Sequence, residues 1–211
     1  SFDALLGVIG TKRKAMAKQA PPRASAQLRA FDLKVAQRLD QLDAQSIVKR
    51  TWARDPFVWV KDPNTPDIRD RLGWLTVGET MAAQADQLTA FAEEVRKSFD
   101  RVVLCGMGGS SLAPEVFWRT FGRKEGFPSL FVLDTTDPRT VGRVEQEGDL
   151  ARTLFIVASK SGTTQEPDSF YRYFWKKTGG RGEQFIAITD PGTRLVDIAN
   201  QNGFRKGFAN P

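Results

Sequence analysis

From residue 102 onward, short apolar runs alternate with stretches of helical pattern, and this alternation restricts the fold more than any other feature. The apolar runs cover residues 102–105, 130–133, 154–158 and 185–188, and the helical stretches begin near Ser111, Pro138, Gln165 and Thr193. Continuously apolar strands that alternate with helices are typical of a parallel sheet covered on both faces. A weaker fifth run spans residues 204–208. The sequence therefore predicts an α/β fold, a three-layer αβα sandwich around a mostly parallel sheet of about five strands.

The segment before this alternation is predicted to be helical and irregular. The pattern over residues 2–18 predicts a helix, which Pro21-Pro22 ends because neither proline can continue the hydrogen-bond ladder. Residues 24–43 predict an amphipathic helix, whose apolar positions recur every three or four residues: Leu28, Phe31, Val35, Leu39 and Leu42. Residues 52–74 carry three of the five tryptophans and several prolines, which predicts an irregular connector. The apolar spacing over residues 76–99 predicts one further helix, which leads into the first strand.

Two residue types limit the chemistry available to this chain. Cys105 is the single cysteine, which excludes a disulfide framework and favours a reducing, cytoplasmic setting. The sequence contains no histidine. Histidine acid–base catalysis, Ser-His-Asp triads and the usual zinc sets are therefore outside what this sequence does alone, and we expect neither a metal site nor a cofactor.

The net charge of +6 is concentrated near the start of the sequence. Residues 1–54 hold 11 Lys and Arg against 4 Asp and Glu, whereas the remainder holds 20 against 21. A basic lead-in on a near-neutral body is typical of a solvated helical face, so nucleic acid is not an expected partner. The apolar stretch at residues 2–9 is short and precedes its basic cluster, which argues against a signal peptide, and no run is long enough to span a membrane.

Two turns rich in glycine and hydroxyl groups follow the first and third apolar runs. The first is Gly-Met-Gly-Gly-Ser-Ser at residues 106–111, and the second is Ser-Lys-Ser-Gly-Thr-Thr at residues 159–164. Turns from a strand into a helix aim backbone N–H groups at an anion, glycines allow its close approach, and hydroxyls add neutral donors. Both turns lie at the carboxyl ends of predicted parallel strands, where open α/β sheets bind ligands. We expect the two turns to hold a phosphorylated small molecule.

Each turn also has a second interpretation. The first resembles a dinucleotide fingerprint, with Asp134 as the ribose-binding acid, although Ser111 replaces the third glycine. In the second, Thr163 and Glu166 have the spacing of a helix-capping box, while the functional interpretation places Glu166 beside the bound phosphate. Lys160 either neutralises the phosphate or contributes only its backbone N–H.

These motifs resemble those of the sugar-isomerase (SIS) domain family and, within it, the phosphoglucose isomerases. The similarity runs from about Leu75 onward and rests on residues 106–112 and 159–166. The first twenty residues are similar to the last helix of transaldolases. In that order, the two pieces resemble the middle portion of bifunctional transaldolase/glucose-6-phosphate isomerase fusions. The resemblance implies a transaldolase-like helix at residues 1–20, a lead-in at residues 21–74 and a first SIS subdomain at residues 75–211.

The resemblance also implies roles for individual residues. The expected phosphate-binding residues are Gly109, Ser110, Ser159, Lys160, Ser161 and Thr164, with Gly109 and Lys160 acting through the backbone. Glu166 matches a carboxylate that orients the ring-opening histidine. The remaining catalytic groups of phosphoglucose isomerases, an arginine, a base glutamate, a histidine and a lysine, correspond to positions beyond Pro211. We therefore expect a hexose-phosphate-binding fragment that lacks the main catalytic groups and relies on the remainder of its chain.

Two other functions stay open at this stage. One is a non-catalytic sugar-phosphate sensor, since the same fold serves in some transcription regulators. Residues 24–54, however, lack a clear recognition helix after a short glycine-containing turn. The other is a dinucleotide-dependent oxidoreductase, which leaves the hydroxyl cluster at residues 159–164 unexplained.

Overall fold

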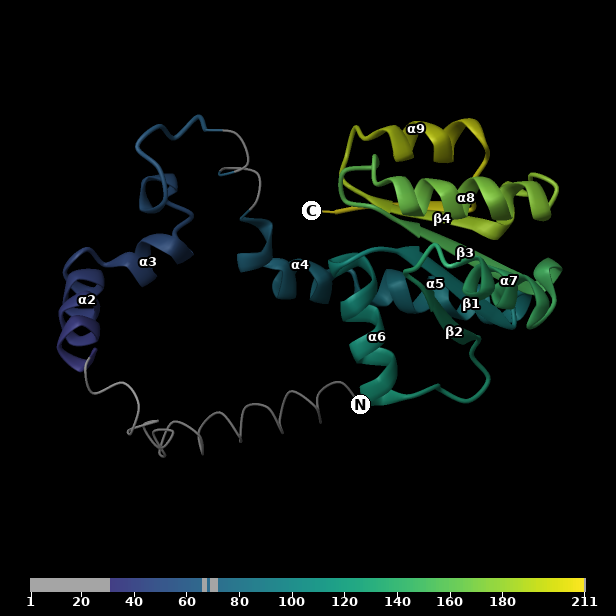
Figure 1. Cartoon of the computed structure of the whole chain (residues 1–211), viewed down its shortest axis with the longest axis horizontal. Helices are drawn as coiled ribbons and strands as arrows, with labels where there is room; N and C mark the ends of the chain where they lie inside the picture. Colours follow the sequence, from purple (N-terminus) through teal and green to yellow (C-terminus); the bar gives the residue numbers. More distant parts are fainter. Residues whose placement is uncertain (1–30, 66–67, 69–71, 211) are drawn as a thin grey trace. The chain divides into compact units, whose positions relative to one another are not determined.

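The alternating apolar runs form one five-stranded sheet in the computed structural model, which describes residues 31–65, 68 and 72–210 (Figure 1). Its strands are β1 (Arg101–Gly106), β2 (Ser129–Leu133), β3 (Thr153–Ala158), β4 (Phe185–Thr189) and β5 (Lys206–Ala209). The order across the sheet is β2-β1-β3-β4-β5, and every neighbouring pair is parallel. The predicted α/β fold is confirmed, with a sheet that is parallel throughout.

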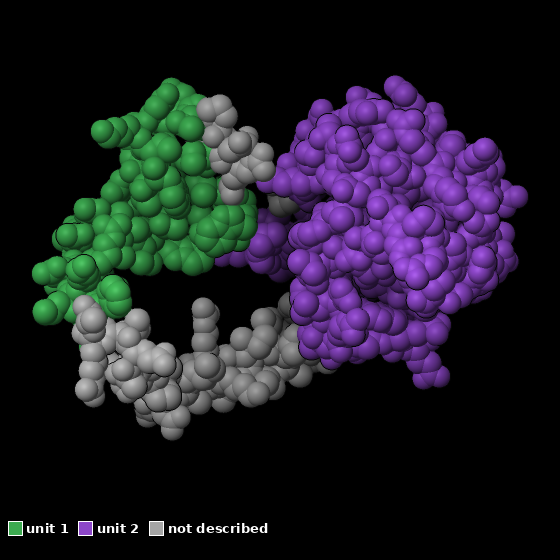
Figure 2. Space-filling model, viewed as in Figure 1, with its two compact units in different colours: residues 1–75 green, residues 76–211 purple. Residues whose placement is uncertain are grey.

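The chain divides into two units, residues 1–75 and residues 76–211 (Figure 2). The described part of the first unit contains α2 (Asp32–Ala44), α3 (Ile47–Trp52) and two short 3₁₀ turns, η1 (Pro56–Val58) and η2 (Gly73–Leu75). The apolar stripe expected on the first of these helices stays exposed at Phe31, Val35 and Leu39. The helix expected at residues 2–18 and the first part of the one expected at residues 24–43 lie outside the described residues.

The second unit, described over residues 76–210, contains six further α-helices. These are α4 (Val77–Ala83), α5 (Ala85–Ser98), α6 (Gly109–Phe121), α7 (Pro138–Gln146), α8 (Gln165–Lys177) and α9 (Arg194–Gln201), with 3₁₀ turns η3 (Leu150–Arg152) and η4 (Gly182–Gln184). The prediction of one helix over residues 76–99 is wrong, because α4 ends and α5 begins on either side of Gln84. There the Gln84 N–H bonds to the Met81 carbonyl, three residues back, in a tighter turn than an α-helix makes.

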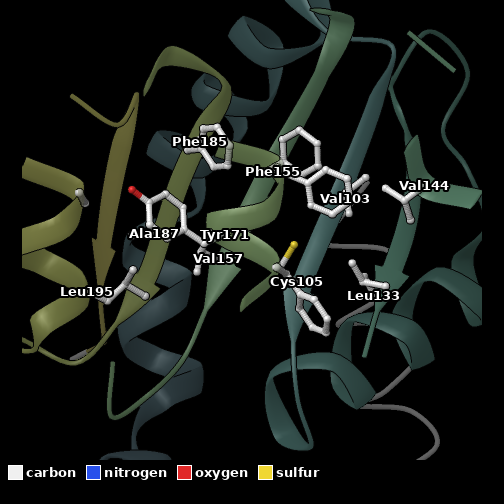
Figure 3. Close-up of a cluster of buried hydrophobic side chains, with 13 residues drawn as sticks. Val103, Cys105, Leu133, Val144, Phe155, Val157, Tyr171, Phe185, Ala187 and Leu195 are labelled. Atoms are coloured by element: carbon white, nitrogen blue, oxygen red, sulfur yellow. The ribbon is translucent and has the colours of Figure 1, made fainter. Parts of the chain in front are cut away.

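Alternate side chains of the strands point to opposite faces of the sheet, and each face is covered by different helices. On one face, β-strand residues such as Val103, Phe155 and Phe185 pack against α7, α8 and α9 (Figure 3). The Phe155 ring is fully buried and stacks on Phe174 at 4.6 Å and on Phe185 at 5.2 Å between ring centroids. On the other face, Leu154 and Ile186 pack against α5. Parallel β–α–β connections are right-handed almost without exception, so we expect α6, which contacts β1 and β2, on this second face as well.

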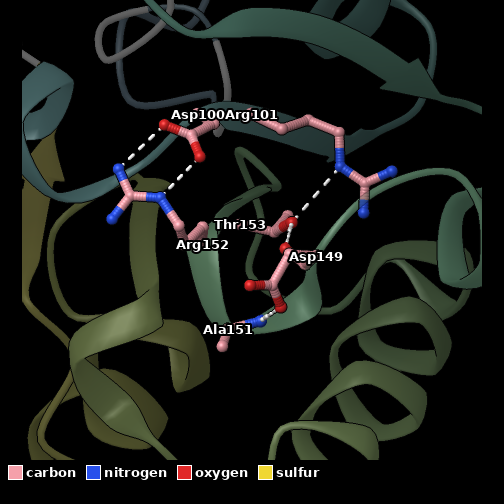
Figure 4. Close-up of polar contacts among 6 residues, drawn as sticks. All are labelled: Asp100, Arg101, Asp149, Ala151, Arg152 and Thr153. Carbon is pink, nitrogen blue, oxygen red and sulfur yellow. Dashed lines mark hydrogen bonds and ion pairs between the residues drawn. The ribbon is translucent and has the colours of Figure 1, made fainter.

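The amino ends of β1 and β3 are joined by a polar network (Figure 4). The Asp100 carboxylate accepts hydrogen bonds from Arg152 Nε at 2.5 Å and Nη2 at 2.8 Å. This guanidinium lowers the pKa of Asp100 below its ordinary value of 3.8. Beside it, Arg101 Nε donates to the hydroxyl of the buried Thr153, which donates to the Asp149 carbonyl. The network links β1 and β3 at their amino ends, whereas the glycine-rich turns follow the carboxyl ends of the same two strands.

Across residues 31–65, 68 and 72–210, no helix combines the length and the apolar character needed to cross a membrane.

Candidate functional site

Strands β1 and β3 are neighbours in the sheet, and their carboxyl ends lie at the same level. Gly106, the last residue of β1, is the register partner of Ala158, the last residue of β3. The chain leaves β1 toward β2 on one side, whereas β3 and β4 lie on the other side. Such a reversal of strand order opens the crevice in which open α/β sheets bind their ligands. Both predicted turns therefore begin side by side at the switch point of the sheet.

The two serines of the first turn, Ser110 and Ser111, lie in different surroundings. Helix α6 begins at Gly109. The Ser110 N–H donates to the Met107 carbonyl at 3.1 Å and the Ser111 N–H to the Gly108 carbonyl at 3.0 Å, so the Gly109 N–H is the amide that this helix end offers to a ligand. The buried Ser111 hydroxyl donates to the Gly108 carbonyl at 3.0 Å, so that side chain serves the turn itself. Ser110 is only half-buried. Gly108 has φ +55°, with nothing within 4 Å of a built Cβ, which leaves open space at the backbone.

The second turn is organised by pairs of hydroxyl groups. Ser159 Oγ and Thr164 Oγ1 lie 2.9 Å apart, with Ser159 buried and Thr164 half-buried. Ser161 Oγ and Thr163 Oγ1 lie 3.0 Å apart at the exposed side of the turn. The three hydroxyls predicted to bind phosphate here, those of Ser159, Ser161 and Thr164, are thus each within 3.0 Å of another hydroxyl in the turn, which ends where helix α8 begins.

Glu166 occupies the second position of α8 and is half-buried. The capping-box interpretation required Thr163 as the residue that caps the helix. This interpretation is wrong, because Thr164 is the capping residue and the Thr163 hydroxyl is paired with Ser161. Glu166 thus follows Thr164 by two residues, in the first turn of α8.

Lys160 is exposed, and its backbone carbonyl is bound to the end of β4. That carbonyl accepts hydrogen bonds from the Asp190 N–H at 3.1 Å and from Thr189 Oγ1 at 3.3 Å. This third strand end had no predicted role from the sequence. The run Thr189-Asp190-Pro191-Gly192-Thr193 after an apolar strand was the signal available for it.

The arrangement favours binding of an anion. Helices α6 and α8, each 13 residues long, begin at neighbouring strand ends, and the amino end of a helix carries partial positive charge. The hydroxyls of Ser110, Ser159 and Thr164 add neutral donors to these amides. Among the described residues, no group of three or more Cys, Asp and Glu side chains gathers in a way that could hold a metal ion.

The sequence pattern of the phosphoglucose isomerase family matches residues 77–188, which include both turns. The fold defines a class of protein: an α/β domain with paired glycine- and hydroxyl-rich turns at the switch point of its sheet. Within that class, the chain belongs to the phosphoglucose isomerase family.

Individual relatives agree with this assignment. Glucose-6-phosphate isomerase of Chlamydia muridarum (strain MoPn / Nigg) is 32% identical over 146 residues, which is 66% of this chain and 26% of the relative. Glucose-6-phosphate isomerase of Parasynechococcus marenigrum (strain WH8102) is 32% identical over 183 residues, which is 79% of this chain and 31% of the relative. The chain thus spans between a quarter and a third of the length of these relatives.

Solved structures support the fold. A crystal structure of a glucose-6-phosphate isomerase from Chlamydia trachomatis D/UW-3/Cx matches with a TM-score of 0.53 and 24% identity, covering 75% of this chain and 30% of that one. A hypothetical protein from Thermus thermophilus matches with a TM-score of 0.60 and 24% identity, covering 85% of this chain and 42% of that one.

Proposed function

We propose that this chain supplies the sugar-phosphate-binding subdomain of an aldose–ketose isomerase that interconverts glucose 6-phosphate and fructose 6-phosphate. The observation that carries the proposal is the pairing of Gly106 with Ala158, which starts the two turns side by side within the region matched by the family. A phosphate dianion between the turns would meet two helix amino ends and several hydroxyl donors.

Each predicted site residue has a part in this binding. We assign hydroxyl donors to Ser110, Ser159, Ser161 and Thr164, and backbone N–H donors to Gly109 and Lys160. The 2.9 Å pairing of Ser159 with Thr164 holds both oxygens close together before the ligand arrives. Binding by groups that are already in position costs less conformational entropy than binding by side chains that must first be ordered.

Glu166 is assigned an orienting role and not proton transfer. In the proposed reaction the sugar ring opens, a base moves a proton between C2 and C1 through a cis-enediolate, and a cation stabilises the developing charge. The 211-residue sequence has no histidine for ring opening. We therefore propose that the second SIS subdomain of a larger isomerase provides these groups, and that this chain alone binds without turnover.

The test is calorimetric titration of the chain with fructose 6-phosphate, inorganic phosphate, fructose and NADH. The proposal predicts heat with fructose 6-phosphate, weaker binding of inorganic phosphate, and no binding of unphosphorylated fructose. No binding of any sugar phosphate would contradict the proposal. Binding of NADH in place of fructose 6-phosphate would instead favour the dinucleotide function.

Two finer assignments go with this proposal. We propose that residues 1–20 are the last helix of a transaldolase-like domain, on the basis of sequence similarity, and these residues lie outside the described part of the chain. We also propose a cytoplasmic setting, supported by the single Cys105, which is a buried free thiol. Burial raises the pKa of that thiol, so it stays protonated and unreactive at neutral pH.

A further inference from the structure

The end of strand β4 holds the backbone of the second turn from one side. The Ser159 N–H donates to the Ile188 carbonyl at 3.0 Å, as in a continuing sheet. One residue later, the Lys160 carbonyl accepts bonds from the Asp190 N–H at 3.1 Å and from Thr189 Oγ1 at 3.3 Å. The peptide unit between Lys160 and Ser161 is thereby fixed by two donors of the β4 end.

The hydroxyl of Thr189 is itself held by Thr193. A threonine hydroxyl has one hydrogen, and that of Thr189 is directed at the Lys160 carbonyl. In the 2.8 Å contact between Thr189 Oγ1 and Thr193 Oγ1, Thr193 is therefore the donor. Thr193 is the capping residue of α9, yet its side chain makes no capping bond to that helix. Its hydroxyl is used for Thr189 instead.

This chain of bonds determines where the next amide points. In a trans peptide the carbonyl and the following N–H point in opposite directions, and the described residues contain no cis peptide. Because the Lys160 carbonyl points toward β4, the Ser161 N–H points away from it. Strand β1 lies on that other side of β3, and the first glycine-rich turn begins at its end. The Ser161 N–H is thus directed toward the crevice between the two turns.

A packing contact joins the same two segments. Gly162 has φ +66°, and a built Cβ would lie 2.7 Å from Thr193 Cβ. Thr193 therefore occupies the space beside the turn and leaves no room for a side chain at residue 162.

We propose that Thr189 and Thr193 are positioning residues of the phosphate site, an inference that rests on the proposed function. Their hydroxyls, acting in series on the Lys160 carbonyl, orient the Ser161 N–H toward the ligand. A carbonyl that accepts hydrogen bonds also polarises its own peptide unit, which makes the attached N–H a stronger donor. Neither threonine needs to touch the sugar phosphate to act in this way.

The test compares Thr193→Val and Thr189→Val with the wild-type chain by titration with fructose 6-phosphate and by the NMR amide proton shift of Ser161. Each valine keeps the shape of threonine and removes the hydroxyl. We expect about three- to tenfold weaker binding for each, the effect of one hydrogen bond, because the Asp190 N–H still holds the carbonyl. The Ser161 amide shift should move in the free variants, while that of Gly109, in the other turn, should not. Thr193→Ser restores the hydroxyl and should restore both readouts.

The controls separate this inference from the proposed function. Thr120→Val makes the same change at an exposed site on α6 and should alter neither readout. The positioning role would be overturned if the wild-type chain binds and both valine variants keep the wild-type affinity and the wild-type Ser161 amide shift. Absence of wild-type binding would contradict the proposed function, and the Ser161 shift in the free chain would still report on the orientation. If buried Thr189→Val fails to fold, the half-buried Thr193 carries the test.

Discussion

Ser159 Oγ and Thr164 Oγ1 lie 2.9 Å apart across the second turn, one on the residue after β3 and the other on the residue that caps α8. The pair joins the end of a strand to the start of a helix. The pair has two hydroxyl hydrogens: one lies between the two oxygens, and the other is free to turn toward a ligand. The relationship makes these two side chains the first to test for a role in phosphate binding.

Replacing either hydroxyl should weaken sugar-phosphate binding. One hydroxyl of the pair donates to the phosphate and the other holds it in place, so Ser159→Ala and Thr164→Val each remove either the donor or its support. A hydrogen bond to a charged phosphate is worth about 1.5–3 kcal/mol, or about ten- to a hundredfold in Kd. Calorimetric titration with fructose 6-phosphate measures the loss. Ser169→Ala is the matched control, because its hydroxyl donates to the Gln165 carbonyl on the exposed side of α8. Wild-type affinity in both site variants would show that the hydroxyl pair does not contact the ligand.

A methyl group at Gly162 should disturb the turn more than one at Gly192. Both glycines have positive φ, +66° and +71°, so alanine strains the backbone at either position by about 1–2 kcal/mol. Only the Gly162 Cβ would also collide with Thr193, whereas nothing lies within 4 Å at Gly192. We expect Gly162→Ala to lose about 1–3 kcal/mol more in unfolding free energy than Gly192→Ala. Equal losses of unfolding free energy for the two variants, measured in urea, would mean that Thr193 leaves room for a side chain at residue 162.

The core should be most sensitive at Phe155. Its ring is fully buried between Phe174 and Phe185, so Phe155→Ala leaves a cavity on the α8 side of the sheet. We expect a loss of about 3–5 kcal/mol in urea unfolding. Phe117→Ala is the exposed control, since that side chain is 62% exposed, and it should change stability by less than about 0.5 kcal/mol. A loss of similar size in both variants would contradict the assignment of the core.

The Asp100–Arg152 pair should make stability depend on pH in the acidic range. The folded-state pKa of Asp100 lies below 3.8, so the pair stabilises the fold above about that pH, and the contribution is lost as pH falls through the folded-state pKa. The difference in Tm between wild type and Asp100→Asn should be present at pH 7 and shrink below pH 3.8. High salt should reduce it at pH 7, because both side chains are partly exposed. A difference that grows on acidification would contradict this account.

The sheet could be predicted from the sequence because its strands are apolar on both faces. The starts of α7 at Pro138 and of α8 at Gln165 were also predicted, since each follows a turn with clear helix-start residues. The break at Gln84 was missed because the apolar periodicity continues across it. Apolar spacing predicts which face of a helix is apolar but not whether another element covers it, as the exposed Val35 and Leu39 show.

For the site, the sequence supplied the two turns but not the third strand end. Strand order depends on tertiary packing, so nothing local showed that β4 would lie beside β3 or that Thr189 would reach the Lys160 carbonyl. The residues around Thr193 form an ordinary polar turn until the neighbouring turn is placed against them. That placement is the information that a sequence alone lacks.

The most direct measurement of the central claim is an NMR titration of this chain with fructose 6-phosphate, followed residue by residue. If both turns hold one phosphate, the amide signals of Gly109, Ser110, Ser161 and Thr164 shift together along a single binding curve, while those of Asp100 and Arg152 at the opposite edge do not. Shifts confined to one turn, different Kd values for the two turns, or no shift in either would contradict the claim.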